Sequence, residues 1–222
     1  VFRNYRDARR EERVEKEPLY FPGEVMLALV RAYERLGDER LLEGARRIAD
    51  RQMSLYAWNL RLDIPRNGDH WIMQALQELA AVTGEHGYAE LSVLMGRGYV
   101  REQYPPQEAR YPDYRGAYRR IADAPRTTRA ASRGEALGGA MRAARLIGAD
   151  AGPFVDALVL GARHLIEQQF DGPNEYFIPD GWDVRGAIRM GVVDNHCRID
   201  NNQHAIVGML AALEAIDLRD GR

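Results

Sequence analysis

The stretch EVMLALVRAYERLGDERLLEGARRIADRQM, residues 24–53, decides the fold of this chain. In its first half the apolar residues recur every three or four positions, as they do on one face of an α-helix. Gly37 and Asp38 then interrupt the pattern, because glycine favours the end of one helix and aspartate the start of the next. In the second half the apolar spacing returns, with arginines and acidic residues on the opposite face. The stretch therefore predicts a helical hairpin.

The same arrangement recurs along the chain. Further helical patterns lie at 71–79 paired with 88–99, at 130–146 paired with 154–166, and at 201–213. The turns LGDE at 36–39, TGE at 83–85 and IGAD at 147–150 separate an apolar helix from a more charged one. Repeated two-helix units bury their apolar faces by stacking on one another. We therefore predict an all-α fold of repeated helical hairpins, in a single domain over 1–222, built as a solenoid or a helical ring.

Long connections lead into the first helix of each hairpin. They cover 56–68, 104–127 and 170–200. A ring suits them better than a solenoid, whose links are short, and loops of this length usually carry function. In the last one, the segments 175–178 and 186–189 flank turn residues at 179–182, so we expect a small β-hairpin there.

Composition excludes several classes of function. The formal net charge of -2 gives no field that would attract nucleic acid. No apolar run approaches the roughly 20 residues that span a bilayer, so we expect a soluble protein without a membrane partner and favour the cytoplasm. Lys16 is the only lysine and has no glycine-rich loop beside it, which argues against Schiff-base chemistry and a P-loop. We expect no organic cofactor.

Metal-ligand residue types gather near the end of the last long connection. They are Asp194, His196, Cys197 and Asp200, and their spacing fits no familiar zinc motif. With Cys197 as the single cysteine, a four-cysteine zinc site is impossible. The sequence analysis therefore predicts no metal site.

Short polar motifs open the first helix of several hairpins. They are YFPGE at 20–24, with LGDER at 36–40 closing that helix, DHW at 69–71, and RID at 198–200 followed by Gln203 and His204. In layout and in the placement of these motifs, most of the chain resembles the six-hairpin, or α/α-toroid, glycosidase-like superfamily. The resemblance implies a ring of inner helices whose loop-bearing ends form a cleft for sugars. Members of that superfamily include hydrolases, epimerases and polysaccharide lyases.

The chain departs from that superfamily in the number of its repeats. It carries three predicted hairpins and part of a fourth, fewer than a six-hairpin ring contains. We therefore expect a partial or complete α/α toroid that is a fragment of a longer chain, a reduced ring, or a ring completed by a second copy in a homo-oligomer.

Acidic residues and a histidine at these helix starts are the candidate catalytic groups. They are Asp69, Asp200, His204 and Glu24. Converging carboxylates are what glycoside hydrolysis requires. A carboxylate at Asp200 shares a helix face with His204, four residues on, and could orient that imidazole as a general base. The alternative is structural, because Asp69 and Asp200 also occupy N-cap positions.

A second set of residues is expected to bind the substrate. It consists of Tyr20, His70, Trp71, Arg129, Glu135, Arg189 and Arg198. The flat indole of Trp71 suits a sugar ring, although its place in an apolar series equally fits the core. Guanidinium groups could bind the carboxylates of an acidic sugar or a phosphate, with salt bridges to neighbouring acids as the alternative.

These residues together predict a carbohydrate-active enzyme. It would be glycoside hydrolase-, epimerase- or lyase-like, with acid and base groups at the mouth of a helical ring and a carbohydrate or other small polar ligand as partner. The alternative is a non-catalytic scaffold module that binds a glycan or a protein segment at the same mouth.

Overall fold

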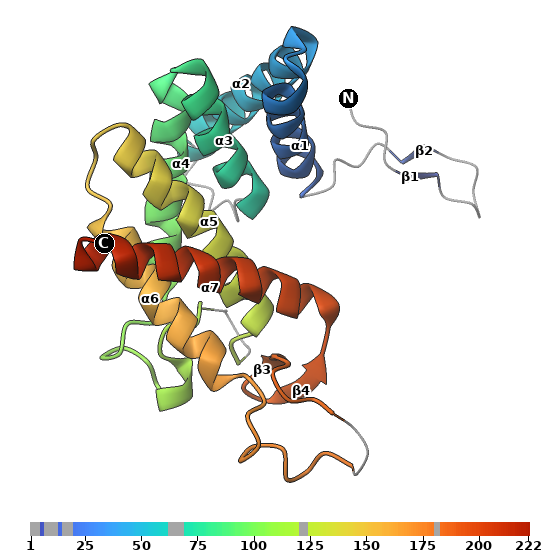
Figure 1. The fold of residues 1–222 in the computed structure, drawn as a ribbon, viewed down its shortest axis with the longest axis vertical. Coiled ribbons are helices and arrows are strands. Elements are labelled where there is room, and N and C mark those ends of the chain that lie inside the picture. The colour runs from blue at the N-terminus through green and yellow to red at the C-terminus, as the bar shows by residue number, and fades with distance from the viewer. Residues whose placement is uncertain (1–4, 7–12, 15–19, 62–68, 120–123, 180–182) are drawn as a thin grey trace.

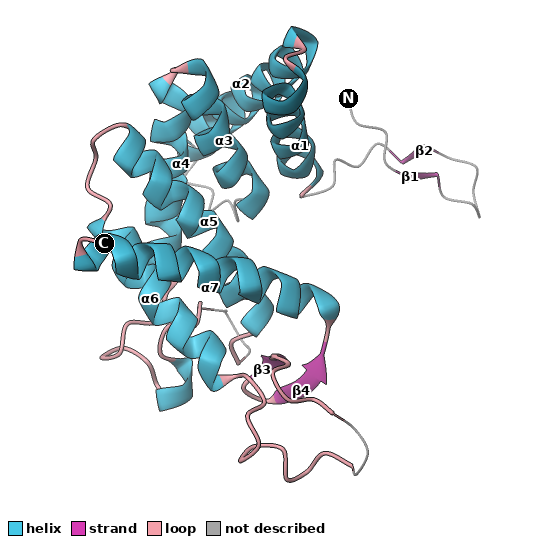
Figure 2. Ribbon diagram, viewed as in Figure 1, coloured by secondary structure: helices cyan, strands magenta, loops and turns pink. Residues whose placement is uncertain are grey.

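A computed structural model describes residues 5–6, 13–14, 20–61, 69–119, 124–179 and 183–222. Its helices are α1 (Phe21–Leu36), α2 (Glu39–Arg61), α3 (His70–Thr83), α4 (His86–Glu102), the 3-10 helix η1 (Pro112–Tyr114), α5 (Thr127–Leu146), α6 (Gly152–Glu167) and α7 (Ile199–Asp220). Its strands are β1 (Tyr5–Arg6), β2 (Arg13–Val14), β3 (Arg189–Gly191) and β4 (Asp194–Cys197). The predicted all-α class with a small β-hairpin is confirmed (Figure 2). Within these residues no helix combines the length and apolar content needed to cross a bilayer.

The predicted turns end their helices as expected. Gly37, Gly84 and Gly148 have φ angles of 67°, 72° and 68°, in the left-handed region that glycine adopts most easily. The N–H of Gly37 donates to the carbonyl of Tyr33, and that of Gly84 to the carbonyl of Ala80. Each glycine thus satisfies a carbonyl at the helix end, and the chain reverses into the next helix.

The helices form two rows. α1, α3, α5 and α7 pack against one another in that order, and α2, α4 and α6 lie along the same side of this row (Figure 1). α1, α3 and α5 each pack on their own hairpin partner and on the next odd-numbered helix, as stacked hairpin repeats do, and α7 packs on α5 and α6. α1 and α7 lie at the two ends of the row, and its closure into a toroid stays a prediction.

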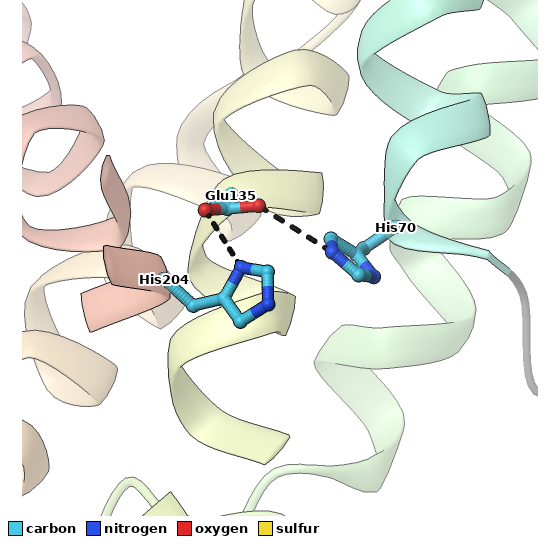
Figure 3. A group of neighbouring side chains, drawn as sticks. All are labelled: His70, Glu135 and His204. Carbon is cyan, nitrogen blue, oxygen red and sulfur yellow. Dashed lines mark hydrogen bonds and ion pairs between the residues drawn. The ribbon is translucent and has the colours of Figure 1, made fainter. Parts of the chain in front are cut away.

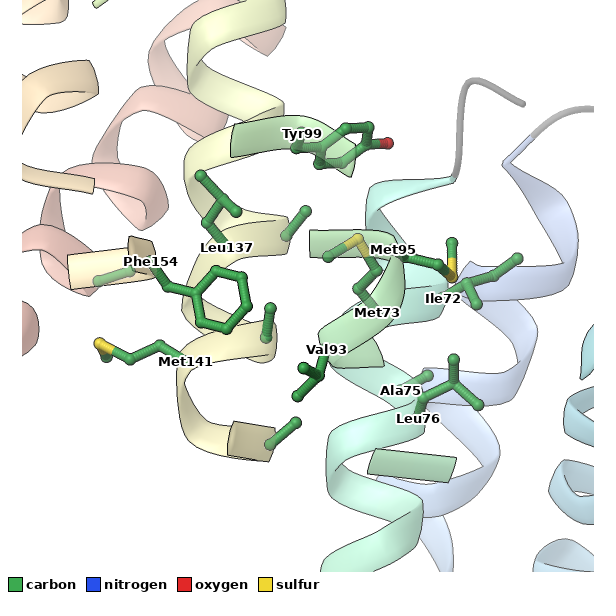
Figure 4. Packing of buried hydrophobic residues seen from close by; sticks show 14 of the residues in the cluster. Ile72, Met73, Ala75, Leu76, Val93, Met95, Tyr99, Leu137, Met141 and Phe154 are labelled. Carbon is green, nitrogen blue, oxygen red and sulfur yellow. The ribbon is translucent and has the colours of Figure 1, made fainter. Parts of the chain in front are cut away.

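α5 lies at the centre of the molecule because its residues are small. It contacts α3, α4, α6 and α7 and carries buried alanines and glycines on most of its surface. The core includes large apolar side chains from α3, α4 and α6 and from α5 itself (Figure 4). Those drawn include Met73, Leu76, Val93, Leu137, Met141 and Phe154.

Glycines bring the backbones of three helices close together. A Cβ atom on Gly139 of α5 would lie 3.0 Å from the Cα and N atoms of Gln74 and from the carbonyl oxygen of Met73, both on α3. On the other side of α5, a Cβ on Gly134 would lie 3.0 Å from the Cα of Gly208 in α7. Only residues without a side chain allow these approaches, so the glycines set the spacing of α3 and α7 from α5.

The β-hairpin lies later in the chain than the sequence analysis placed it. β3 and β4 pair antiparallel, with Arg189 opposite Cys197. The expected first strand at 175–178 is instead made of turns and a bend, and residues 180–182 of the expected turn lie outside the described part of the chain. The actual turn is Val192–Val193. Valine is not a typical turn residue, which explains why the sequence predicted the turn at 179–182 instead.

Candidate functional site

Three polar side chains from three inner helices meet in one buried cluster (Figure 3). Glu135 of α5 lies between His204 of α7 and His70 of α3. Its Oε1 is 3.1 Å from the Nδ1 atom of His204, and its Oε2 is 3.5 Å from the Nε2 atom of His70. We call this group the His–Glu–His cluster. Glu135 was expected near a helix start but lies about two turns into α5, because α5 begins at Thr127.

The contact between α3 and α5 explains the position of His70. Gln74 lies one helical turn after His70, and Gly139 lies one turn after Glu135. Because Gly139 lets the two backbones touch at Gln74, the side chains one turn earlier are brought to within reach of each other.

The contact between α5 and α7 places His204 in the same way. Gly208 lies one turn after His204 and packs on Gly134, the neighbour of Glu135. A Cβ on Gly208 would come within 3.7 Å of the backbone N of Glu135. The imidazole of His204 therefore reaches the carboxylate from the side opposite to His70.

The cluster is buried at its centre and reaches the surface at its edge. The side chain of Glu135 is 1% exposed, and those of His70 and His204 are 8% and 12% exposed. Burial, with a smaller contribution from His204 and Arg133, lowers the pKa of His70 to about 3. His70 is therefore neutral at neutral pH, with one ring nitrogen able to accept or to bind a cation.

Asp69 fixes the entry to α3. As predicted it is the N-cap, and its Oδ1 accepts a hydrogen bond from the N–H of Trp71 at 2.9 Å. Its Oδ2 accepts from the N–H of Gly23 in α1 at 3.0 Å. Burial raises the pKa of Asp69 to about 7, against the opposing effect of these N–H donors. The carboxyl group thus joins the starts of α1 and α3 beside the cluster.

Aromatic rings border the two histidines. The rings of Tyr20 and His70 have centroids 5.4 Å apart, and those of Trp71 and His204 are 5.9 Å apart. Tyr20 is 47% exposed and Trp71 is half-buried. Of the residues that the sequence singled out, Tyr20, His70, Trp71, Glu135 and His204 therefore lie together, with the two aromatic rings beside the histidines.

Two predicted catalytic carboxylates, Asp200 and Glu24, are not members of the cluster. Asp200 was expected at the N-cap of the last helix, but α7 begins at Ile199 and its N-cap is Arg198. Both oxygens of Asp200 accept hydrogen bonds from the guanidinium of Arg198, at 2.9 and 2.6 Å. Glu24 lies exposed in the first turn of α1. Asp200 is therefore part of an ion pair and is not the partner of His204.

The other predicted arginines make local contacts. Arg129 donates to the carbonyl of Arg119 at 2.6 Å. Arg189 donates to the side-chain oxygens of Gln168 at 3.0 Å and of Asn195 at 3.3 Å. These contacts hold the loops before α5 and around the β-hairpin, and they do not bring either guanidinium to the cluster.

Sequence reasoning missed Arg133. This buried arginine of α5 is bound to Glu102 at 2.8 Å and lies over the rings of Tyr99 and Tyr118. It contributes to the lowered pKa of His70. The sequence could have indicated Arg133, because it lies in a helix otherwise rich in small residues. A large cation buried in such a helix needs charged or polar partners.

A separate hollow of about 660 Å³ lies between α4, α6 and the loop that follows α4. Charged side chains line part of it, namely Arg101, Glu108, Arg119, Asp150 and Asp156. None of the predicted site residues lines this hollow, so it is distinct from the His–Glu–His cluster.

Comparison with known proteins identifies no relative: no family model, curated protein or solved structure matches the chain.

Proposed function

We propose that the chain is a carbohydrate-active enzyme whose His204 transfers a proton, with Glu135 orienting it. The observation that carries the proposal is the 3.1 Å contact between Nδ1 of His204 and the buried carboxylate of Glu135. A carboxylate can only accept, so Nδ1 carries the proton and Nε2 keeps a free lone pair. A histidine held in this way is a general base.

The aromatic border supports a sugar as the substrate. Tyr20 and Trp71 present rings next to the histidines, and apolar ring faces pack well on the C–H faces of a sugar. A carbohydrate or other small polar ligand is the partner that this arrangement suits. The consecutive packing of α1, α3, α5 and α7 supports the expected α/α toroid, in which such a site would lie at the mouth of the ring.

Among the three expected reaction classes, epimerase- or lyase-like chemistry fits best. A glycoside hydrolase needs two available carboxyl groups beside the scissile bond. Asp69 uses both oxygens on main-chain N–H groups, and Asp200 uses both on Arg198. A histidine base is one of the groups that can remove a C–H proton, and this chemistry does not need a second available carboxyl group.

The proposed step begins with a sugar carbon next to a carbonyl or carboxylate group. Nε2 of His204 takes the proton from that carbon, and the electron pair of the C–H bond moves to the carbonyl oxygen to give an enolate. An epimerase then returns a proton to the opposite face, whereas a lyase expels the oxygen on the adjacent carbon.

The test follows deuterium from solvent into the sugar. Chelator-treated protein is incubated in D2O with a panel of reducing sugars and uronate-containing oligosaccharides, and exchange or double-bond formation is measured by NMR. The change His204→Gln is expected to lower the rate at least ~100-fold, the lower end of the usual effect of a general base. The exposed His86, at the far end of the α3–α4 hairpin, gives the control His86→Gln, which keeps the wild-type rate.

Equal rates for the wild type and His204→Gln would refute the assigned base. Sugar binding without exchange or elimination would favour the binding module instead. A panel that gives neither binding nor reaction would count against a carbohydrate substrate.

A further inference from the structure

Two buried atoms of the His–Glu–His cluster have no hydrogen-bond partner among the described residues. They are Nε2 of His70 and Oε2 of Glu135, which face each other at 3.5 Å. Buried polar atoms in folded proteins are almost always satisfied by protein, water or an ion. The two atoms are therefore available to a further partner.

The donor atoms of the cluster are spaced like the ligands of a tetrahedral metal ion. One ring nitrogen of His70, one ring nitrogen of His204 and one carboxylate oxygen of Glu135 all lie within 4.8 Å of one another. Ligand atoms bound at about 2.0–2.1 Å to tetrahedral zinc lie roughly 3.3 Å apart. The contact at 3.5 Å is to one oxygen of Glu135 and the contact at 3.1 Å is to the other, and both are close to this spacing. A metal ion would therefore be bound by both carboxylate oxygens, or by one of them after a rotation of the carboxylate.

We propose that His70, Glu135 and His204 form a binding site for one divalent transition metal ion, with Zn²⁺ as the best fit. Two imidazoles and one carboxylate suit zinc, whereas Mg²⁺ and Ca²⁺ prefer sites made of oxygen atoms. Three protein ligands leave the fourth position open to water or a substrate oxygen, as in catalytic zinc sites. Tyr20 and Trp71, whose rings contact the two imidazoles, lie beside the site.

The surroundings hold the three ligands in place before a metal arrives. Each comes from a different helix, and the glycine contacts described above fix the distances between those helices. Preorganised ligands on rigid elements lose little freedom on binding a metal.

The potential metal ligands near the β-hairpin do not form an equivalent site. His196 is exposed and bound to Asp194, and Asp200 is bound to Arg198. Cys197 is exposed as well. These residues are close together in the sequence. The three ligands of the His–Glu–His cluster, in contrast, come from distant parts of the chain.

The metal site does not depend on the proposed reaction. A bound metal would occupy Nδ1 of His204 in place of the proton that Glu135 accepts, so proton transfer by His204 requires the metal-free form. Zinc is accordingly expected to inhibit the proposed reaction, and each proposal can fail while the other survives.

The test is a zinc titration of chelator-stripped full-chain protein by calorimetry, without any sugar. One Zn²⁺ per chain is expected, with a dissociation constant of about 1 μM or lower. The changes His70→Gln, Glu135→Gln and His204→Gln should each weaken binding by more than ~100-fold, beyond what loss of an outer-shell partner costs. His196→Gln and Cys197→Ser are the matched controls and should bind as the wild type does.

Every outcome decides the proposal. No stoichiometric binding by the wild type, or unchanged binding by the three cluster variants, would overturn it. Loss of zinc binding in either control variant would show that the metal binds at the β-hairpin instead. Circular dichroism checks that the variants fold, and Co²⁺ in place of Zn²⁺ should give the visible absorption of a tetrahedral site only when the cluster is intact. If a cluster variant does not fold, the wild type still decides: its thermal midpoint must rise when zinc is added.

Discussion

Replacing Gly139 with valine is expected to lower the free energy of unfolding by about 3 kcal/mol, at the upper end of what overpacking usually costs. A Cβ at this position would lie 3.0 Å from backbone atoms of Gln74 and Met73, which cannot move aside as a flexible side chain can. α3 must shift away from α5, and His70 then moves away from Glu135. Urea unfolding followed by circular dichroism measures the loss, and the zinc titration measures the separation.

Gly98 provides the matched control for this change. It lies in α4, where the nearest atom to an added Cβ is the end of a flexible arginine side chain at 4.0 Å. Gly98→Val should stay within about 0.5 kcal/mol of the wild type, because the two residues differ little in helix propensity. A Gly139→Val protein as stable as Gly98→Val would show that this glycine does not set the helix spacing.

Replacing Glu135 with glutamine should affect both the proposed reaction and the proposed metal site. The amide keeps the size of the side chain but has no negative charge, so it neither orients His204 as a carboxylate does nor binds a metal well. Turnover of the chelator-treated protein is expected to fall ~1000-fold, within the range for loss of acid–base catalysis. The rate assay described above measures it, with the thermal midpoint as a check on folding.

Glu78 supplies the comparison for that experiment. It also lies on an inner helix, α3, but pairs with Arg31 at the surface. Because exposed ion pairs contribute little, Glu78→Gln should retain full turnover. Activity of Glu135→Gln within tenfold of the wild type would remove Glu135 from the mechanism.

The sequence predicted the helical hairpins well because their signals are local. Apolar spacing and the glycines at 37, 84 and 148 identify the first three hairpins without reference to the rest of the chain. Asp69 was also recognisable as an N-cap, since capping depends on the neighbouring backbone. Its second bond, to Gly23, joins two helices and has no local signal.

The site was predicted only in part because it depends on contacts between helices. His70, Glu135 and His204 were all singled out, but their meeting is decided by glycine contacts whose partners the sequence does not reveal. Asp200 was paired with His204 on helical spacing alone. In the structure the guanidinium of Arg198 donates hydrogen bonds to both oxygens of Asp200.

The most direct test of the central claim, that Glu135 holds the two imidazoles, is ¹⁵N NMR of the histidine ring nitrogens in metal-free protein. The signals of His204 can be assigned with the His204→Gln variant. The account predicts a proton on Nδ1 of His204, and loss of that preference in Glu135→Gln, because the carboxylate accepts this hydrogen bond. A proton on Nε2 of His204, unchanged by the Glu135→Gln substitution, would contradict it.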